Sequence, residues 1–266
     1  MREIVVGLIF VAVTGASLVS AALSDLRSRE ASDLHWYAVC AMGILTTIAL
    51  VMPDRPSIAV TRAMGIAILT VYMLSQRIIG SLEPMFLVIG SALFLIPGAF
   101  EGDWSGLRAL LPFLLFLLMY TAGVIRGGAD AKALMSLALT LPSTCMLPLG
   151  SGGPTTLPLV FPIVLLALLM SLLFCIPVLS ASIRQGCPSA TCYRIPIDRV
   201  RTAHVWPVED VVDGIIVEDA GLNDAEGRIS RLRDAGATDV LVTPMVPFLV
   251  PLCAAFIVVV ILPAVL

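Results

Sequence analysis

Charge is scarce in this chain. Only 13% of its 266 residues are Asp, Glu, Lys or Arg, whereas about a quarter of the residues of a soluble domain are charged. Hydrophobic residues make up 59% of the chain, and its mean hydropathy is +1.02. The formal net charge of -3 gives no basic field for a nucleic-acid partner. The composition therefore excludes an ordinary soluble domain and predicts a protein of the lipid bilayer.

Histidine is rare as well, and the cysteines do not form a metal-binding pattern. The chain has two histidines and six cysteines, and most of the cysteines lie within apolar stretches, where they act as small hydrophobic residues. Cys187 and Cys192 are near each other, but they lack the spacing of a zinc pair and no histidine is close by. We therefore expect neither a metal site nor a cofactor.

Long apolar runs are what the chain has in abundance. A membrane-spanning helix needs about 20 mostly apolar residues. Eight segments are candidates: residues 4–23, 34–52, 57–74, 85–100, 107–125, 133–149, 157–180 and 245–266. The third carries Arg62 and the fourth is short, so the number of spans stays open between six and eight. Because open strands would leave unpaired backbone groups in lipid, we predict an all-α polytopic membrane helix bundle.

Basic residues suggest how the bundle is oriented. They follow the odd-numbered segments: Arg27, Arg29, Arg77, Arg126, Lys132, Arg184, Arg194, Arg199 and Arg201. The alternate connections contain only Arg55, and Arg108 just inside the fifth segment is a mild exception. By the positive-inside rule, the odd segments end at the cytoplasmic face. The first segment lacks a strongly basic start and is followed by further spans, so we expect a true first helix and not a cleaved signal peptide.

A polar stretch interrupts the apolar pattern before the last segment. Here "GIIVED" and "TDVLVTP" predict strands, and "LNDAEGRISRLRDAG" predicts a helix capped by Asn223 and ended by Gly236. We expect a small cytoplasmic α/β lobe whose core contains Ile215, Val217, Ile229, Leu232, Val240 and Val242. The predicted organisation is a transmembrane catalytic bundle over residues 1–182, the lobe over 183–243 and a last transmembrane helix over 244–266.

Carboxylates gather at the expected cytoplasmic ends of the helices. Asp25 ends the first segment, Asp33 begins the second, and Asp130 in "RGGADAKAL" begins the sixth. Helix starts attract aspartate through the helix dipole, so Asp33 and Asp130 also suit an ordinary structural role. The glycines Gly127 and Gly128 favour a site, because they let another backbone, such as a bound peptide strand, approach closely.

Two neighbouring carboxylates can hydrolyse a peptide without metal, cofactor or histidine. One stays ionised and takes a proton from water, while the other is protonated and polarises the peptide carbonyl. Like charges held close cannot both ionise easily, so their pKa values split. The aspartates therefore make hydrolysis by a carboxylate pair the chemistry to test.

The two aspartate stretches also resemble motifs of a known family. "SDLRSRE" with Asp25, "GGADAKAL" with Asp130 and the proline-rich "TPMVPFLVP" are similar to motifs of the type IV prepilin peptidases, membrane aspartic proteases of the GxGD class. The resemblance is closer to the archaeal preflagellin (prearchaellin) peptidase branch, in which a hydrophobic residue can replace the last motif glycine, as Ala129 does here. The chain departs from bacterial members, which usually carry a cysteine-pair zinc loop and an Ile-Pro-Asn-like ending where this chain reads "EASD". The third and fourth segments resemble an insertion between the two motifs.

This resemblance implies an activity and a site. Family members remove the short basic leader, a class III signal peptide, from archaellin or type IV pilin-like precursors at the cytoplasmic membrane face. By motif match, Asp25 and Asp130 would be the catalytic pair, with Gly127, Gly128 and Lys132 in substrate-binding positions. The expected partners are those precursors and the lipid bilayer, with no nucleic acid, metal or cofactor.

Three other functions stay open at this point. An ion- or proton-coupled transporter could use Asp25 and Asp130, although such proteins place their acids nearer mid-bilayer. "LALTLPSTCMLP" leaves room for a polar cavity of that kind. A non-catalytic assembly protein would need neither aspartate, and a presenilin-type protease would have a tyrosine beside its first aspartate, which "LSDLR" lacks. If Asp33 only starts a helix, Asp33→Asn retains activity.

The sequence alone also leaves several properties undecided. They are the precursor that is cleaved, the oligomeric state, the role of the lobe, and whether the aspartates are paired without substrate.

Overall fold

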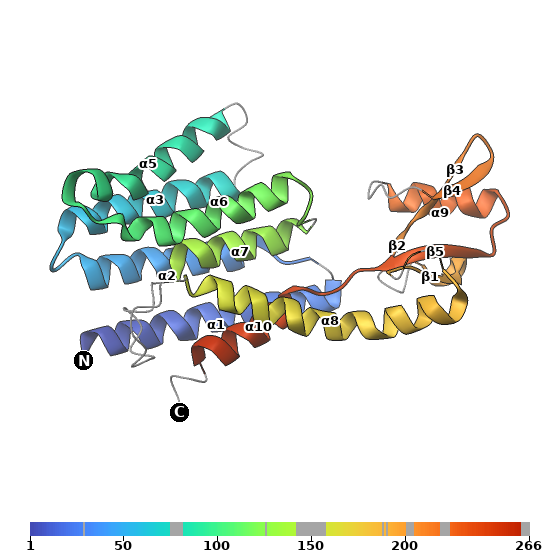
Figure 1. Cartoon of the computed structure of the whole chain (residues 1–266), viewed down its shortest axis with the longest axis horizontal. Coiled ribbons are helices and arrows are strands. Elements are labelled where there is room, and N and C mark those ends of the chain that lie inside the picture. The colour runs from blue at the N-terminus through green and yellow to red at the C-terminus, as the bar shows by residue number, and fades with distance from the viewer. Residues whose placement is uncertain are drawn as a thin grey trace. The chain divides into compact units, whose positions relative to one another are not determined.

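The computed structural model describes residues 1–28, 30–74, 82–125, 127–141, 158–187, 189, 191–200, 205–218 and 224–261. The chain divides into two compact units, which Figure 1 displays with their elements labelled. The first contains Met1–Leu168 and Phe248–Leu266, and the second contains Leu169–Pro247.

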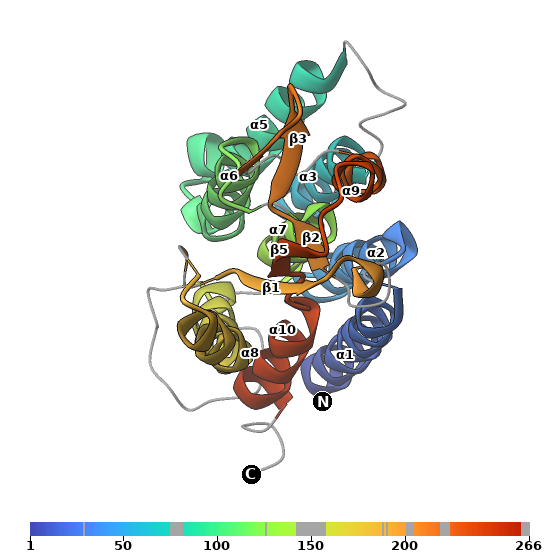
Figure 2. The same ribbon diagram turned by 90° about the vertical axis from the view of Figure 1, so that its right-hand side faces the viewer.

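Helices build the first unit. They are α1 (Arg2–Ser28), α2 (Asp33–Val51), α3 (Pro56–Leu74), α5 (Glu83–Glu101), the short η2 (Trp104–Gly106), α6 (Leu107–Thr121), α7 (Gly128–Thr140), the first part of α8 (Val160–Gln185), α10 (Leu249–Phe256) and its π-helical continuation η4 (Ile257–Ile261). Helix α2 packs against α1, α3 and α7, while α5 packs on α3, α6 on α7 and α10 on α1. Figure 2 views these helices nearly end-on.

Six of the described helices are long and apolar enough to cross a membrane: α1, α2, α3, α5, the stretch Trp104–Thr121 and α8. Helix α7 and the stretch Leu249–Val260 are apolar but shorter. Each of the eight segments expected from the sequence thus contains a helix, including the third and fourth, although residues 142–149, 157 and 262–266 lie outside the described part. The prediction of a mostly helical chain is confirmed, and the six long apolar helices are compatible with a membrane bundle.

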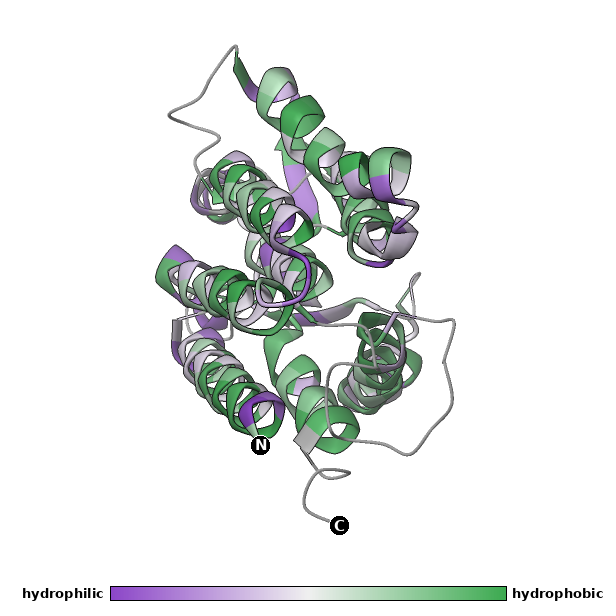
Figure 3. Ribbon diagram, turned by 90° about the vertical axis from the view of Figure 1, so that its left-hand side faces the viewer, coloured by the Kyte–Doolittle hydropathy of each residue, from purple (hydrophilic) through white to green (hydrophobic). Residues whose placement is uncertain are grey.

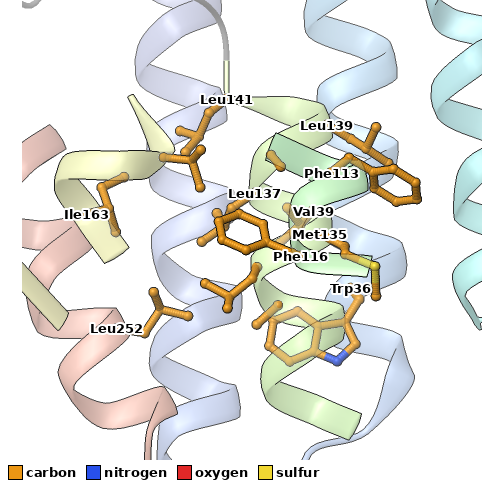
Figure 4. Close-up of a cluster of buried hydrophobic side chains, with 14 of the residues drawn as sticks. Trp36, Val39, Phe113, Phe116, Met135, Leu137, Leu139, Leu141, Ile163 and Leu252 are labelled. Atoms are coloured by element: carbon orange, nitrogen blue, oxygen red, sulfur yellow. The ribbon is translucent and has the colours of Figure 1, made fainter. Parts of the chain in front are cut away.

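Helix α7 is the buried centre of this bundle. Nine of its residues are buried: Ala131, Ala133, Leu134, Met135, Ser136, Leu137, Ala138, Leu139 and Thr140. A helix that is buried all round belongs to a core. Figure 4 shows Met135 and Leu137 of α7 among Trp36 of α2, Phe116 of α6 and Leu252 of α10. Asp130 therefore lies in the first turn of the central helix of the bundle.

Small residues let neighbouring helices approach closely. A Cβ atom at Gly43 of α2 would lie 2.4 Å from Cγ2 of Thr140 in α7. A Cβ at Gly90 of α5 would lie 2.6 Å from Cδ2 of Leu69 in α3. Such contacts are typical of helix pairs in membranes, where packing replaces the hydrophobic effect between helices.

Most residues of the helices are hydrophobic, as the green colour of the ribbons in Figure 3 shows, and many of their large hydrophobic side chains are exposed. Helix α8 is the extreme case, because only 11% of the residues in its most apolar 18-residue stretch are buried. Exposed side chains such as Leu172, Leu173 and Phe174 lie along it. Exposed apolar surface on this scale suits contact with lipid.

The second unit contains a small α/β fold after α8. Its elements are β1 (Tyr193–Pro196), η3 (Ile197–Arg199), β2 (Val205–Pro207), β3 (Glu209–Val212), β4 (Ile215–Glu218), α9 (Ala225–Asp234) and β5 (Asp239–Pro244). Strand β5 is the centre of an antiparallel sheet of order β1-β5-β2, and β3 pairs with β4 in a separate hairpin. The predicted elements β4, α9 and β5 are confirmed, as is Gly236, which follows α9 with φ 79°.

Two details of the predicted lobe are wrong. Helix α9 is capped by Asp224, which has φ 57° and whose carboxylate accepts a hydrogen bond from the Gly227 amide at 3.2 Å, whereas Asn223 lies outside the described residues. Ile215 and Val217 are absent from the core, and Ile215 is 67% exposed. The reason is that β4 pairs with β3 and not with β5. The core instead contains Ile197, Val200, Val205, Ile229, Leu232, Val240 and Val242.

Candidate active site

Asp25 and Asp130 lie at the same end of the helix bundle. Asp25 is in the last turn of α1 and Asp130 is in the first turn of α7. Figure 1 shows the connection from α1 to α2 and the connection from α6 to α7 at this same end. Helix α2, which packs against both α1 and α7, brings the two segments together although about a hundred residues separate them in the sequence.

Polar side chains fix the connection after Asp25. The hydroxyl of Ser24 donates to the carbonyl oxygen of Glu30 at 2.7 Å, so the end of α1 and the following turn are joined. His35 in the first turn of α2 makes a 3.0 Å hydrogen bond with the hydroxyl of Ser20 in α1. The sequence pattern pointed to none of these contacts, because serine and histidine carry no local signal for a partner in another helix. Together they hold the start of α2 beside the turn that presents Asp25.

Gly127 makes room for the Asp130 carboxylate. It precedes α7 in an extended conformation, with φ -77° and ψ 115°. A Cβ atom at Gly127 would lie 2.3 Å from Oδ2 of Asp130, far inside van der Waals contact. At Gly128 the nearest atom to an added Cβ is the Tyr120 hydroxyl oxygen at 3.7 Å, which is an ordinary contact. The position of the Asp130 carboxylate therefore requires a glycine at residue 127 but not at residue 128.

The two carboxyl groups interact electrostatically. Asp130, which precedes the apolar stretch from residue 133, is partly buried, and this burial raises the pKa of its carboxyl group to about 7. The negative charge of Asp25 contributes to the same rise in pKa. One oxygen of the Asp25 carboxylate, Oδ2, is itself buried. The sequence-predicted pair therefore interacts in the folded chain, and the carboxyl group of Asp130 titrates near neutral pH.

Lys132 pairs with the third aspartate of this end. Its Nζ lies 2.6 Å from Oδ1 of Asp33, the first residue of α2. The N-cap of α2 is Ser32, whose hydroxyl accepts a hydrogen bond from the Leu34 amide at 3.3 Å. The Asp33 carboxylate is consequently engaged with α7 in addition to lying in the first turn of α2.

A cavity lined by both polar and apolar side chains lies further along α7 and belongs to a different part of the bundle. Its lining includes Thr46, Arg62, Arg108 and Thr140, but neither Asp25 nor Asp130. Thr140 follows Asp130 by ten residues, which is about 15 Å along a helix. Residues 138–141 of "LALTLPSTCMLP" line it, and the rest of that stretch lies outside the described residues. The cavity and the carboxylate pair are therefore separate features.

The fold and this site define a class: a membrane-type helix bundle with an interacting carboxylate pair at one end. Within the described part of the chain, no group of three or more His, Cys, Asp and Glu side chains is placed to hold a metal ion. No protein-family model matches the chain, and no curated protein matches it. Any assignment of function thus rests on the site itself and on the motifs that compose it.

Proposed function

We propose that this protein is a membrane aspartic endopeptidase that removes the short basic leader from archaellin or type IV pilin-like precursors at the cytoplasmic membrane face. The observation that carries the proposal is the meeting of two carboxyl groups at one end of the bundle, where Gly127 leaves room for the Asp130 carboxylate. Burial and, to a smaller extent, the negative charge of Asp25 raise the pKa of Asp130. Perturbed carboxyl groups that share one site are the mark of acid–base chemistry. The substrate class comes from the motif resemblance, on which the leader and its precursors depend.

The two carboxyl groups have different roles in the proposed reaction, because one begins protonated and the other begins ionised. Asp130, whose pKa lies near 7, holds the proton and donates it to the oxygen of the scissile carbonyl. Asp25 carries the negative charge and accepts a proton from water, whose oxygen then attacks the carbonyl carbon. The product of this step is a neutral gem-diol, with Asp25 protonated and Asp130 ionised.

Collapse of the gem-diol restores both groups. Asp25 gives its proton to the leaving nitrogen as the C–N bond breaks, and Asp130 takes a proton from one diol hydroxyl. The products are a carboxylic acid and an amine, and the site returns to its starting protonation state. Each aspartate is thus needed in both directions of proton transfer, so the loss of either one abolishes the reaction.

Cleavage of a tagged precursor in membranes tests this function. The precursor carries a basic leader and a glycine before the cut, and wild type is compared with Asp25→Asn and Asp130→Asn. Asparagine keeps the size and hydrogen bonds of the side chain but cannot hold the proton, so both variants are expected to be folded, membrane-inserted and inactive. Cleavage by wild type alone supports the proposal. Failure of folded wild type to cut several such precursors refutes it.

The same raised pKa favours a second candidate, a proton-coupled transporter that uses Asp25 and Asp130. A carboxyl group that titrates near neutral pH in a membrane protein can carry a proton. Purified protein in sealed vesicles distinguishes the two functions: a transporter moves protons across the vesicle membrane and leaves precursors uncut.

A further inference from the structure

The Asp33–Lys132 ion pair links the two segments that carry the catalytic aspartates. Lys132 follows Asp130 by two residues in α7, and Asp33 follows Asp25 by eight residues at the start of α2. The lysine Nζ donates to the aspartate Oδ1 at 2.6 Å. The pair therefore joins the catalytic segments through short stretches of chain on both sides.

Lys132 and Asp130 leave α7 in different directions. Residues two apart in a helix are separated by roughly 200° around its axis, so they do not face the same neighbour. Lys132 reaches α2 through Asp33, while Asp130 interacts with Asp25 at the end of α1. The lysine can thus hold the helix without occupying the space around the catalytic carboxyl groups.

The first turn of α7 has few other side chains with which to fix its position. Gly128, Ala129 and Ala131 accompany Asp130 there, and none of these three extends beyond a methyl group. The close contact between Gly43 and Thr140 holds α2 and α7 together, but at the other end of α7. The ion pair is a directional contact between α2 and the catalytic end of α7.

Stability is a poor explanation for this pair. The side chains of Lys132 and Asp33 are 27% and 41% exposed. Ion pairs at such exposure contribute little to the free energy of folding, because water screens them and two flexible side chains must be ordered. Their geometry matters more than their energy when the linked segments must place two carboxyl groups accurately.

We propose that Asp33 and Lys132 are positioning residues, whose ion pair holds the first turn of α7 against α2 and so sets the approach of Asp130 to Asp25. The inference rests on the proposed peptidase function. It replaces the substrate-binding role expected for Lys132 from the motif, and it gives Asp33 a task beyond starting a helix.

Steady-state cleavage kinetics of single and double variants test the pair. Lys132→Gln and Asp33→Asn are each expected to lower kcat about 10- to 100-fold with KM unchanged, because a misplaced catalytic group slows the chemical step. The double variant is expected to match the single variants, since both remove the same interaction. Lys132→Arg keeps the pair and is expected to restore most of kcat. Arg2→Gln removes an exposed charge at the other end of α1 and serves as the control.

A second measurement does not depend on activity. The infrared band of the protonated Asp130 carboxyl group, identified by its loss in Asp130→Asn, is followed against pH in the same variants. If the pair sets the approach of Asp25, the apparent pKa of Asp130 falls in Lys132→Gln, although loss of the lysine charge alone would raise it, and it returns in Lys132→Arg. Thermal unfolding of each variant confirms that the fold is intact.

These results separate the two hypotheses. A raised KM in Lys132→Gln, with Asp33→Asn like wild type, overturns positioning and supports substrate binding by Lys132. Unchanged kinetics and an unchanged Asp130 titration in both variants also overturn it. If wild type cuts no precursor while the Asp130 titration still follows the pair, the peptidase function fails and the positioning of the carboxyl groups stands.

Discussion

Replacing Gly127 with alanine would test the geometry of the site at a single atom. The new Cβ would lie 2.3 Å from Oδ2 of Asp130, whereas ordinary contacts begin at 3.4 Å. The carboxylate must therefore move by about 1 Å, since 3.4 minus 2.3 leaves 1.1 Å. The backbone itself is not strained, because φ -77° and ψ 115° are open to alanine. The atom that has to give way is the free end of the Asp130 side chain, so the helix can stay in place.

The size of the effect follows from this displacement. A shift of about 1 Å in a catalytic group costs about 100-fold in rate, which corresponds to about 2.7 kcal/mol in the activation barrier. The matched control is Gly128→Ala, whose Cβ would meet only the Tyr120 hydroxyl oxygen at 3.7 Å. We expect this control to stay within about threefold of wild type, a barrier change of less than 1 kcal/mol.

Precursor cleavage in membranes gives the readout, with kcat and KM determined for both variants. Thermal unfolding in detergent is run in parallel, and Gly→Ala at these positions should leave stability unchanged or raise it slightly. A folded Gly127→Ala protein that cleaves as fast as Gly128→Ala would refute the reasoning, since the carboxylate position that Gly127 permits would then have no part in catalysis.

Three further predictions concern the titration of Asp130, in catalysis and in stability, and the core of the lobe. Because the pKa of Asp130 is raised to about 7, kcat/KM should fall as the pH rises through about 7, and a pH–rate profile that stays flat from about pH 6 to about pH 9 would contradict its role as the acid. Between its ordinary pKa of 3.8 and about 7, the Asp130 carboxyl group is protonated in the folded state and ionised in the unfolded state. Its contribution to the free energy of unfolding should therefore decrease as the pH rises from about 4 to about 7. Thermal unfolding at several pH values measures this decrease. In the lobe, Leu232→Ala should cost about 2–5 kcal/mol because its side chain is fully buried, whereas Ile215→Ala should change stability by less than about 0.5 kcal/mol. Chemical unfolding of the two variants compares them, and equal losses would mean that Ile215 belongs to the core after all.

Local patterns in the sequence were sufficient for the helices and for part of the lobe. A run of about 20 apolar residues can be stable in lipid only as a helix, so each long run became one. In the lobe, β4, α9 and β5 follow from their own apolar spacing and turn residues. The short strands β1, β2 and β3 were missed because β1 and β2 each end in proline and β3 begins with two acidic residues, whereas β4 begins with a run of three apolar residues. The core was mispredicted at Ile215 because pairing of β4 with β3 depends on residues elsewhere in the chain.

The sequence by itself determined the class of the protein and the chemical groups at its candidate site. Composition indicated a membrane protein, and Asp25 and Asp130 stand out because the apolar runs that they adjoin, residues 4–23 and 133–149, carry no charge. Only the tertiary structure decided how these groups relate. Packing of α2 against α1 and α7 brings the two aspartates close enough for their charges to interact. Gly127 differs from Gly128 because a side chain at position 127 would collide with the Asp130 carboxylate, whereas one at position 128 would not. The packing also gives Lys132 a partner in Asp33. These are contacts between segments distant in sequence, and their geometry is set by helix packing, which no local pattern encodes.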